Sequence, residues 1–326
     1  MISDGSKMTG LMLQNGKLEV QTDLHLPQPP DQEVLVKVRM AGVCETDLQL
    51  VQGYMNYEGI LGHEFVGVPA TGKFAGRRVA ADINCCTLED CPYCPENRHH
   101  CPNRSVIGIL NRPGAFAEYL SVPEENLFLV PESISDERAV FIEPLAAALQ
   151  VLEQTAISAQ SNVVVMGDGR LGYLTAQVVA STGAKLLVVG KHKEKLRRFQ
   201  NCHIETVTLE KLERTRSYDF VIDCTGSITG LPLALQLVRP QGTVVMKTTV
   251  AEPYQIDMSQ IIIDELKIIG SRCGPFPRAI DALAENEIEV ESLITSRFPL
   301  AEAKTALEAA SQKNQHKVLI SIDTQS

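Results

Sequence analysis

The sequence predicts an α/β protein in which a β-rich part is joined to a parallel, doubly wound sheet. Up to about residue 140, short strand-like segments are interrupted by glycine and proline, and helical periodicity is sparse. After Pro144, apolar strand-like runs alternate with helical segments. A glycine-rich motif that begins at Gly167 stands between the first strand and the first helix of this alternation. Such alternation is typical of a parallel sheet with helices on both faces.

The individual elements follow from local apolar patterns. Residues 34–38 and 114–122 are strand candidates in the β-rich part. Residues 162–166 form a largely β-branched run, as a strand buried on both faces requires. Later strands are expected at 186–189, 220–222, 243–246, 266–269 and 318–322, and helices at 145–154, 171–182, 193–199, 231–238 and 301–311.

The length and the charge of the chain limit its class. At 326 residues it is long enough for two domains. Its 40 acidic residues outnumber its 30 basic ones, and the net charge of −10 disfavours nucleic acid or an anionic membrane as a partner. No apolar run approaches the roughly 20 residues of a membrane-spanning helix, and the N-terminus lacks the pattern of a signal peptide. A cytoplasmic protein is therefore expected.

The motif Gly-Asp-Gly-Arg-Leu-Gly that begins at Gly167 is predicted to bind a dinucleotide. It follows a buried strand and opens a helix, which is the context that such a fingerprint requires. Gly167 permits the tight turn, Gly169 lets the backbone approach a pyrophosphate, and Gly172 lets the helix pack closely on the strand. Arg170 and Leu171 stand at the start of that helix, whose N–H groups would face the anion.

The end of the second strand of the alternation indicates which dinucleotide is used. NAD-specific domains carry an Asp or Glu there, about 20 residues past the glycines, for the ribose 2′-hydroxyl. Here the strand ends at Gly190, and Lys191 and His192 follow. Gly190 has no carboxylate and leaves room for a phosphate, Lys191 brings positive charge, and His192 can donate a hydrogen bond. The sequence therefore predicts NADP, with NAD as the alternative if this turn is only a solvated surface.

Three segments ahead of the glycine motif carry metal-ligand side chains. They contain Cys44, the adjacent pair His63 and Glu64, and Glu143. Each alone is ambiguous, because a lone cysteine usually belongs to the core and a lone histidine is usually a satisfied polar residue. Together they offer a thiolate, an imidazole and carboxylates, a set that can hold a catalytic metal and leave one position open.

These motifs and their order resemble those of the zinc-containing medium-chain dehydrogenases, in particular the branch of sorbitol and other polyol or sugar dehydrogenases. The resemblance covers nearly the whole chain, up to a Lys-Val-Leu sequence that begins at Lys317. It implies a GroES-like catalytic domain over residues 1–147 and 275–326 and a Rossmann cofactor domain over residues 148–274. It also implies a place for Lys317 among the cofactor-binding residues, and a homodimer or homotetramer.

The resemblance further implies a reaction and the residues that perform it. The chain would transfer a hydride between an alcohol or polyol, or the matching carbonyl, and a nicotinamide cofactor. Cys44 and His63 would bind the catalytic zinc. Glu64 would be a further ligand or an adjacent carboxylate, and Glu143 would bind the zinc directly or through its water.

Proton transfer would begin at Thr46, whose hydroxyl matches the group that accepts the substrate proton in the family. Asp47 would orient the zinc-bound imidazole. The family often has a histidine three residues after the Thr46 position, but this chain has Gln49 there. The proton is therefore expected to reach solvent by another route.

A second metal site is expected in a cysteine-rich stretch between residues 85 and 101. In a reducing compartment, clustered cysteines bind metal more often than they form disulfides. The family has a Cys-x2-Cys-x2-Cys-x7-Cys lobe, which is resized here because Leu88 replaces the first cysteine and six residues precede the last. We expect a structural zinc on Cys86, Cys91, Cys94 and Cys101, with Cys85, His99 and His100 as alternative ligands and a metal-free lobe as the alternative state.

Two other functions compete with this interpretation. One is a zinc-free quinone or enal reductase on the same fold, and the other is a non-catalytic protein that only binds a cofactor or zinc. The set of Cys44, His63 and Glu143 speaks against both, because neither function needs it.

Overall fold

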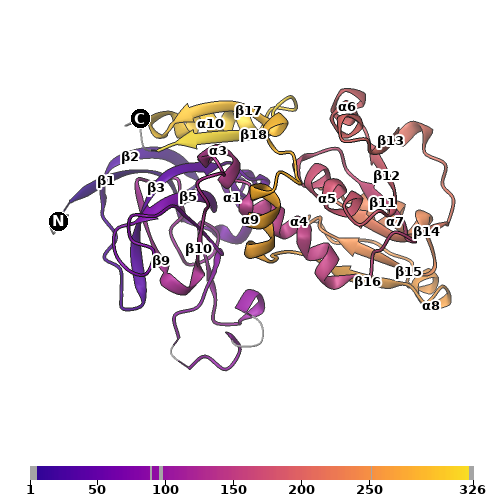
Figure 1. The fold of residues 1–326 in the computed structure, drawn as a ribbon, viewed down its shortest axis with the longest axis horizontal. Helices are drawn as coiled ribbons and strands as arrows, with labels where there is room; N and C mark the ends of the chain where they lie inside the picture. Colours follow the sequence, from indigo (N-terminus) through magenta and orange to yellow (C-terminus); the bar gives the residue numbers. More distant parts are fainter. Residues whose placement is uncertain (1–5, 89, 95–97, 251, 323–326) are drawn as a thin grey trace. The chain divides into compact units, whose positions relative to one another are not determined.

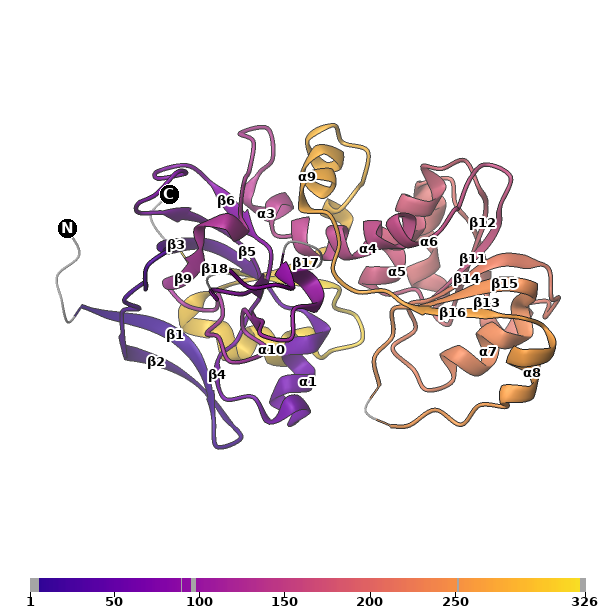
Figure 2. The same cartoon turned by 90° about the horizontal axis from the view of Figure 1, so that it is seen from below.

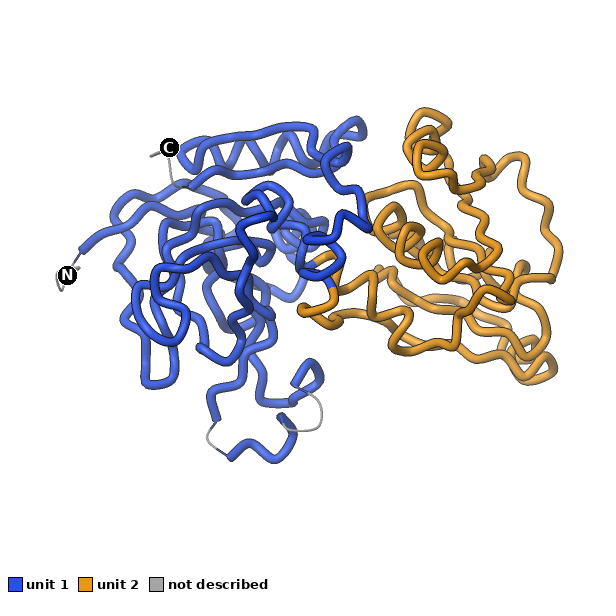
Figure 3. The backbone as a smooth tube through the Cα atoms, viewed as in Figure 1, with its two compact units in different colours: residues 1–143, 279–326 blue, residues 144–278 orange. Residues whose placement is uncertain are grey.

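The computed structural model describes residues 6–88, 90–94, 98–250 and 252–322, and Figure 1 shows its ribbon. The chain forms two compact units, which Figure 3 draws in two colours. Unit 1 consists of residues 1–143 and 279–326, and unit 2 of residues 144–278. The boundaries expected from the sequence, after residues 147 and 274, lie near these.

Unit 1 is built on a seven-stranded sheet. Its strands lie in the order β10 (Leu127–Leu129), β6 (Val79–Ala81), β5 (Glu64–Pro69), β3 (Glu33–Gly42), β18 (Lys317–Ser321) and β17 (Ile294–Pro299), and β9 (Tyr119–Pro123) also pairs with β3. Two smaller sheets contain β2 (Lys17–His25), β1 (Lys7–Gln14) and β4 (Gly59–Ile60), and β7 (Asn84–Cys85) and β8 (Ser105–Val106). This confirms the predicted β-rich part.

Helices in unit 1 are short. They are α1 (Glu45–Val51), α3 (Asp136–Ala139) and α10 (Ala303–Ala310), while α4 (Ile142–Gln154) and α9 (Phe276–Ala284) cross the unit boundaries. Single 3₁₀ turns in the chain lie at Tyr54–Asn56, Arg98–His100, Glu124–Asn126, Leu209–Lys211, Glu291–Leu293 and Leu300–Glu302. In the part of the chain that the structure describes, no helix combines the length and apolar character needed to cross a membrane.

The last strand of the chain lies inside the large sheet. β18 pairs antiparallel with β3 and parallel with β17. Its Val318, Leu319 and Ile320 are fully buried, so the C-terminal segment shares the core of the N-terminal one. The pairing places Lys317, at the start of β18, near the end of β3, which also pairs with β5 at Glu64.

The predicted strand 114–122 is shorter in the structure, where β9 begins at Tyr119. Residues 114–116 instead donate their N–H groups to the backbone carbonyls of residues 60–62. Gly114 allows this close approach, because a Cβ at that position would collide with the carbonyl oxygens of Leu61 and Gly62. The irregular segment therefore braces the backbone just ahead of His63.

Unit 2 contains a six-stranded parallel sheet. Its strands lie in the order β13 (Glu205–Thr208), β12 (Lys185–Gly190), β11 (Asn162–Met166), β14 (Tyr218–Asp223), β15 (Val238–Met246) and β16 (Lys267–Gly270). The order 3-2-1-4-5-6 is that of a doubly wound dinucleotide-binding fold. Figure 2 shows α5 (Arg170–Ala180) and α6 (Lys193–Asn201) over one face of the sheet and α7 (Gly230–Leu237) and α8 (Met258–Ile263) over the other.

The core of unit 2 explains which of its elements could be predicted. Val163, Val164 and Val165 of β11 are fully buried, because neighbouring strands flank β11 and helices cover both faces. β13 was not predicted. Its sequence, Glu-Thr-Val-Thr, is mostly polar and lies at the sheet edge, where no continuous apolar run is needed.

Candidate active site

The N-terminus of α1 positions the first predicted metal ligand. Cys44 is the N-cap residue of this helix, and its backbone N–H donates to Oδ2 of Asp47 at 2.8 Å. The hydroxyl oxygen of Thr46 lies 3.8 Å from Sγ of Cys44. Asp47 is completely buried, and its negative charge is favourable at the start of a helix. The helix start thus holds a thiol, a hydroxyl and a carboxylate in one turn.

Asp47 also connects this turn to His63. Oδ1 of Asp47 accepts the backbone N–H of Gly62 at 3.3 Å and lies 3.3 Å from Nδ1 of His63, although the latter contact lacks the geometry of a hydrogen bond. The imidazole is 3% exposed. Burial favours the neutral ring, but Asp47 and Cys44 outweigh it and raise the pKa of His63 well above its ordinary value. The surroundings of this imidazole therefore stabilise positive charge.

Glu64, the next residue, forms a buried ion pair with Lys317. Both side chains are 2% exposed. Gly42 of β3 pairs with Glu64 of β5 on one side and with Leu319 of β18 on the other. β5 and β18 therefore flank the same end of β3. Gly42 leaves the space for the pair, because a Cβ there would lie 3.0 Å from the Glu64 carboxylate and 3.2 Å from Cδ of Lys317. The predicted cofactor residue Lys317 is thus an ion-pair partner of Glu64 in unit 1.

Cys44, His63 and Glu64 form one donor cluster. Their ligand atoms all lie within 4.8 Å of one another. Thiolate, imidazole and carboxylate are the three donor types that bind zinc in proteins, and three protein ligands leave a position for substrate. The donor set therefore fits a catalytic zinc ion.

Glu143 lies at the start of α4 and outside this three-residue cluster. Burial, aided by the negative charge of Glu64 and opposed by the positive charges of His63 and Lys317, raises the pKa of its carboxyl group to about 7. Its carboxyl group therefore feels the charges of the cluster. Direct ligation by Glu143 stays a prediction.

The cysteine lobe forms a second donor cluster. The Sγ atoms of Cys86, Cys91, Cys94 and Cys101 all lie within 4.8 Å of one another, and those of Cys91 and Cys101 are 3.5 Å apart. Sulfurs in a tetrahedral site with Zn–S bonds of about 2.3 Å are about 3.8 Å apart, so the four thiols fit a structural zinc. All nine cysteines are free thiols.

The alternative ligands of the lobe lie elsewhere. Sγ of Cys85 contacts the carbonyl of Ile83 at 3.7 Å and the amide of Asn126 at 3.6 Å, and burial raises the pKa of this thiol to about 12. Nε2 of His99 lies 2.7 Å from Oδ2 of Asp82. His100 is exposed and outside the four-cysteine cluster. Cys86, and not its neighbour Cys85, points toward the other three thiols.

The glycine motif connects β11 and α5. Gly167 has a φ of +122°, and a Cβ there would lie 2.5 Å from the carbonyl oxygen of Cys224. Gly169 is the N-cap residue of α5, and the space where its Cβ would be is open. Arg170 and Leu171 form the start of the helix and are partly exposed. The open space beside Gly169, at the start of α5, fits the close approach of a pyrophosphate to a helix N-terminus.

The end of β12 differs from the expectation. A Cβ on Gly190 would lie 2.7 Å from both Cβ and Oδ2 of Asp168 and 2.8 Å from Cδ2 of Leu196. The space left by the missing side chain of Gly190 is therefore filled by Asp168 and is not open to a phosphate. The carboxylate of Asp168 accepts the backbone N–H of His192 at 2.7 Å. The prediction that Gly190 leaves space for the 2′-phosphate of NADP was wrong.

Asp168 is the residue at the end of β12 that sequence reasoning missed. It stands inside the glycine motif, and strands β11 and β12 are parallel neighbours. Their C-terminal ends therefore meet at one edge of the sheet, so an acid in the first loop can reach the second. The signal available in the sequence was an acid in the first loop combined with a glycine at the end of the second strand.

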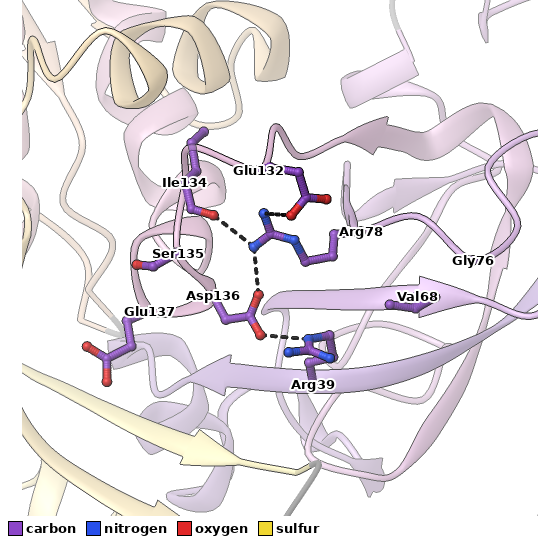
Figure 4. A pocket seen from close by; sticks show the side chains of 9 residues that line it. All are labelled: Arg39, Val68, Gly76, Arg78, Glu132, Ile134, Ser135, Asp136 and Glu137. Carbon is purple, nitrogen blue, oxygen red and sulfur yellow. Dashed lines mark hydrogen bonds and ion pairs between the residues drawn. The ribbon is translucent and has the colours of Figure 1, made fainter. Parts of the chain in front are cut away.

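Unit 1 also has a pocket away from these clusters, which Figure 4 shows. Nε of Arg39 and a terminal nitrogen of Arg78 contact Asp136 at 2.6 and 2.9 Å, and Arg78 also donates to the carbonyl of Ile134 at 2.8 Å. Glu132 lies 3.3 Å from the other terminal nitrogen of Arg78, so two carboxylates balance the two guanidinium groups. No member of either donor cluster lines the pocket. We therefore interpret it as a structural ion-pair network. Its lining residues are Arg39, Val68, Gly76, Arg78, Glu132, Ile134, Ser135, Asp136 and Glu137.

Comparison with known proteins matches both units of the chain. A domain family described as "Alcohol dehydrogenase GroES-like domain" matches residues 30–132, and one described as "Zinc-binding dehydrogenase" matches residues 171–286. A protein named D-arabitol-phosphate dehydrogenase from Enterococcus avium is 30% identical over 91% of this chain and 92% of its own length.

Solved structures match over nearly the whole chain. A zinc-binding dehydrogenase from Sinorhizobium meliloti 1021, described as bound to NADP, has a TM-score of 0.86 and 30% identity over 97% of this chain and all of its own. An alcohol dehydrogenase from Escherichia coli CFT073, described as complexed with NADH, has a TM-score of 0.88 and 28% identity over the same shares.

Proposed function

This chain belongs to the zinc-type medium-chain dehydrogenase family, and from that premise we propose how it works as an NAD(P)-linked oxidoreductase. A zinc ion bound by Cys44, His63 and Glu64 would serve the oxidation of an alcohol or polyol, or the reverse reduction. NADP would be the preferred cofactor. The donor cluster of these three residues, with its ligand atoms within 4.8 Å of one another, carries the proposal.

Each residue around the cluster would have a defined task. When bound, zinc supplies Lewis-acid polarisation of the alcohol oxygen. The Thr46 hydroxyl, 3.8 Å from the Cys44 sulfur, would accept the substrate proton. Asp47 would orient the ring of His63 through Nδ1. Glu143 would hold a proton or a water beside the cluster, which agrees with the pKa of about 7 that burial gives it.

Two observations support NADP. Lys191 and His192 bring basic side chains to the end of β12, where the 2′ substituent of the adenosine ribose would lie. The 30% identical structure from Sinorhizobium meliloti is described as bound to NADP. Gly167, Gly169, Arg170, Leu171 and Gly172 would bind the pyrophosphate.

We also propose a second metal site, an oligomeric state and a location in the cell. The four-cysteine cluster would hold a structural zinc, the protein would form a homodimer or homotetramer, and it would act in the cytoplasm. The zinc-free reductase and the non-catalytic protein are not favoured, because the relatives are zinc-type dehydrogenases and the donor cluster is assembled.

The function is tested by screening alcohols, polyols and sugar phosphates for reduction of NADP and NAD, with zinc measured on the same sample. We expect turnover with at least one polyol or polyol phosphate, and loss of turnover when zinc is removed by a chelator. Full turnover in a zinc-depleted sample would contradict the proposed role of the cluster.

A further inference from the structure

The end of β12 contains a carboxylate that comes from another loop. Asp168 lies between β11 and α5, yet its side chain reaches across to the residues that follow β12. The absence of a side chain at Gly190 makes this reach possible, because a Cβ there would stand 2.7 Å from the carboxylate. Gly190 and Asp168 are therefore a matched pair.

The carboxylate of Asp168 holds His192 at two points. Oδ2 accepts the backbone N–H of His192 at 2.7 Å, and the ring Nδ1 lies 3.1 Å from Oδ2 and 3.2 Å from Oδ1. The Asp168 side chain is 10% exposed, whereas that of His192 is 42% exposed. Asp168 is thus the buried anchor, and His192 presents the outer part of its ring to solvent.

The anchored residue lies in a basic turn. His192 is the N-cap residue of α6, and it stands between the exposed residues Lys191 and Lys193. The exposed Glu194, in the first turn of the helix, is the acid nearest to it in sequence. With Nδ1 held by Asp168, Nε2 is the ring nitrogen left to meet a ligand.

We infer that Asp168 is a positioning residue for cofactor choice: it fixes the backbone and ring of His192 so that His192 and Lys191 together contact the 2′-phosphate of NADP. This inference rests on the proposed NADP preference. The opposite arrangement, in which Asp168 itself bonds the 2′-hydroxyl of NAD, requires the carboxylate to face the ligand. The low exposure of Asp168 and its two contacts with His192 favour the positioning role.

The experiment compares kcat/KM for NADP and for NAD on one substrate in Asp168→Ala, Asp168→Asn and His192→Ala. Hydrogen bonds to charged groups are strong enough that losing the anchor should lower the NADP/NAD ratio about ten- to a hundredfold in Asp168→Ala. Asparagine keeps an oxygen for the His192 N–H, so Asp168→Asn should retain most of the ratio. In a His192→Ala background, Asp168→Ala should change the ratio little further, because its effect passes through His192.

Asp219→Ala is the matched control. Like Asp168, Asp219 contacts one backbone N–H and one basic side chain. It accepts hydrogen bonds from the N–H of Asn162 at 2.7 Å and from Nε of Arg239 at 2.6 Å. It lies at the opposite end of the same sheet, where β11 and β14 begin. Its loss should reduce stability and leave the NADP/NAD ratio unchanged.

The outcomes separate this inference from the proposed function. A wild-type preference for NAD would refute the NADP proposal itself. If the wild type prefers NADP and Asp168→Ala leaves this preference unchanged, only the positioning role is refuted. A rise of the NADP/NAD ratio in Asp168→Ala would also refute it, because it would mean that the carboxylate repels the phosphate. If Asp168→Ala does not fold, the two other variants decide. An unchanged NADP/NAD ratio in His192→Ala overturns the inference. A ten- to hundredfold drop of the ratio in His192→Ala, with the ratio retained in Asp168→Asn, supports it.

Discussion

Replacing Lys317 with methionine should destabilise unit 1 strongly. Lys317 and Glu64 are both 2% exposed and pair with each other, so in the zinc-free protein the change leaves a carboxylate buried without its cation. Breaking such a pair by removing one partner costs about 3–5 kcal/mol. For a unit of this size, roughly 2–4 °C of Tm is lost per kcal/mol, which gives a fall of roughly 6–20 °C.

The assay is thermal unfolding by calorimetry and circular dichroism on samples freed of zinc by a chelator, because zinc on Glu64 would replace the missing positive charge. Lys304→Met, which removes an exposed lysine from α10, is the control and should change Tm little. The double variant Glu64→Gln with Lys317→Met should recover most of the loss, because it removes both charges of the pair. A Lys317→Met protein as stable as the wild type, or a double variant no better than the single one, would refute the reasoning.

Three further predictions follow from other parts of the molecule. Cys94→Ser should remove about one zinc per chain and lower Tm, because a structural zinc contributes folding energy; metal analysis that finds at most one zinc in the native chain would contradict this. Thr46→Val should lower turnover by about 10²–10⁴-fold with unchanged zinc content, and an unaffected rate would move the proton-accepting role to another group, with Glu45 next. Burial opposes ionisation of Glu33, but Arg112 and Ser121 outweigh it and hold its pKa below the ordinary value, so its contribution to stability is present above about pH 4.3 and is lost as pH falls through the folded pKa. The unfolding free energy of Glu33→Gln should therefore fall less than that of the wild type between neutral and acid pH. An equal fall in both proteins would argue against the interaction of Glu33 with Arg112.

Side-chain chemistry made most members of the two donor clusters predictable. Cys44, His63 and Glu143 were predicted from three separate segments, with Glu64 as a further ligand or an adjacent carboxylate, because thiolate, imidazole and carboxylate suit zinc. The fold brings the ligand atoms of Cys44, His63 and Glu64 together, and Glu143 lies outside that cluster. The first thiol of the lobe was harder to choose. Cys85 and Cys86 are adjacent on the chain, so only the direction of each side chain selects Cys86.

Contacts between distant segments could not be predicted from spacing. The ion pair of Lys317 with Glu64 depends on β18 lying beside β3, which no local pattern of the C-terminal segment reveals. The position of Asp168 over Gly190 depends likewise on two loops meeting at one sheet edge. For this reason Gly190→Asp would place its side chain against Asp168. Substitutions of Asp168 and His192 test cofactor choice without that collision.

The most direct test of the zinc mechanism is a combined measurement of zinc content and turnover in Cys44→Ser. Cys202→Ser, which changes a cysteine outside both donor clusters, serves as the control. We expect two zinc ions per chain in the wild type and the control, and one zinc, no turnover and undiminished cofactor binding in Cys44→Ser. Wild-type turnover in Cys44→Ser would contradict it.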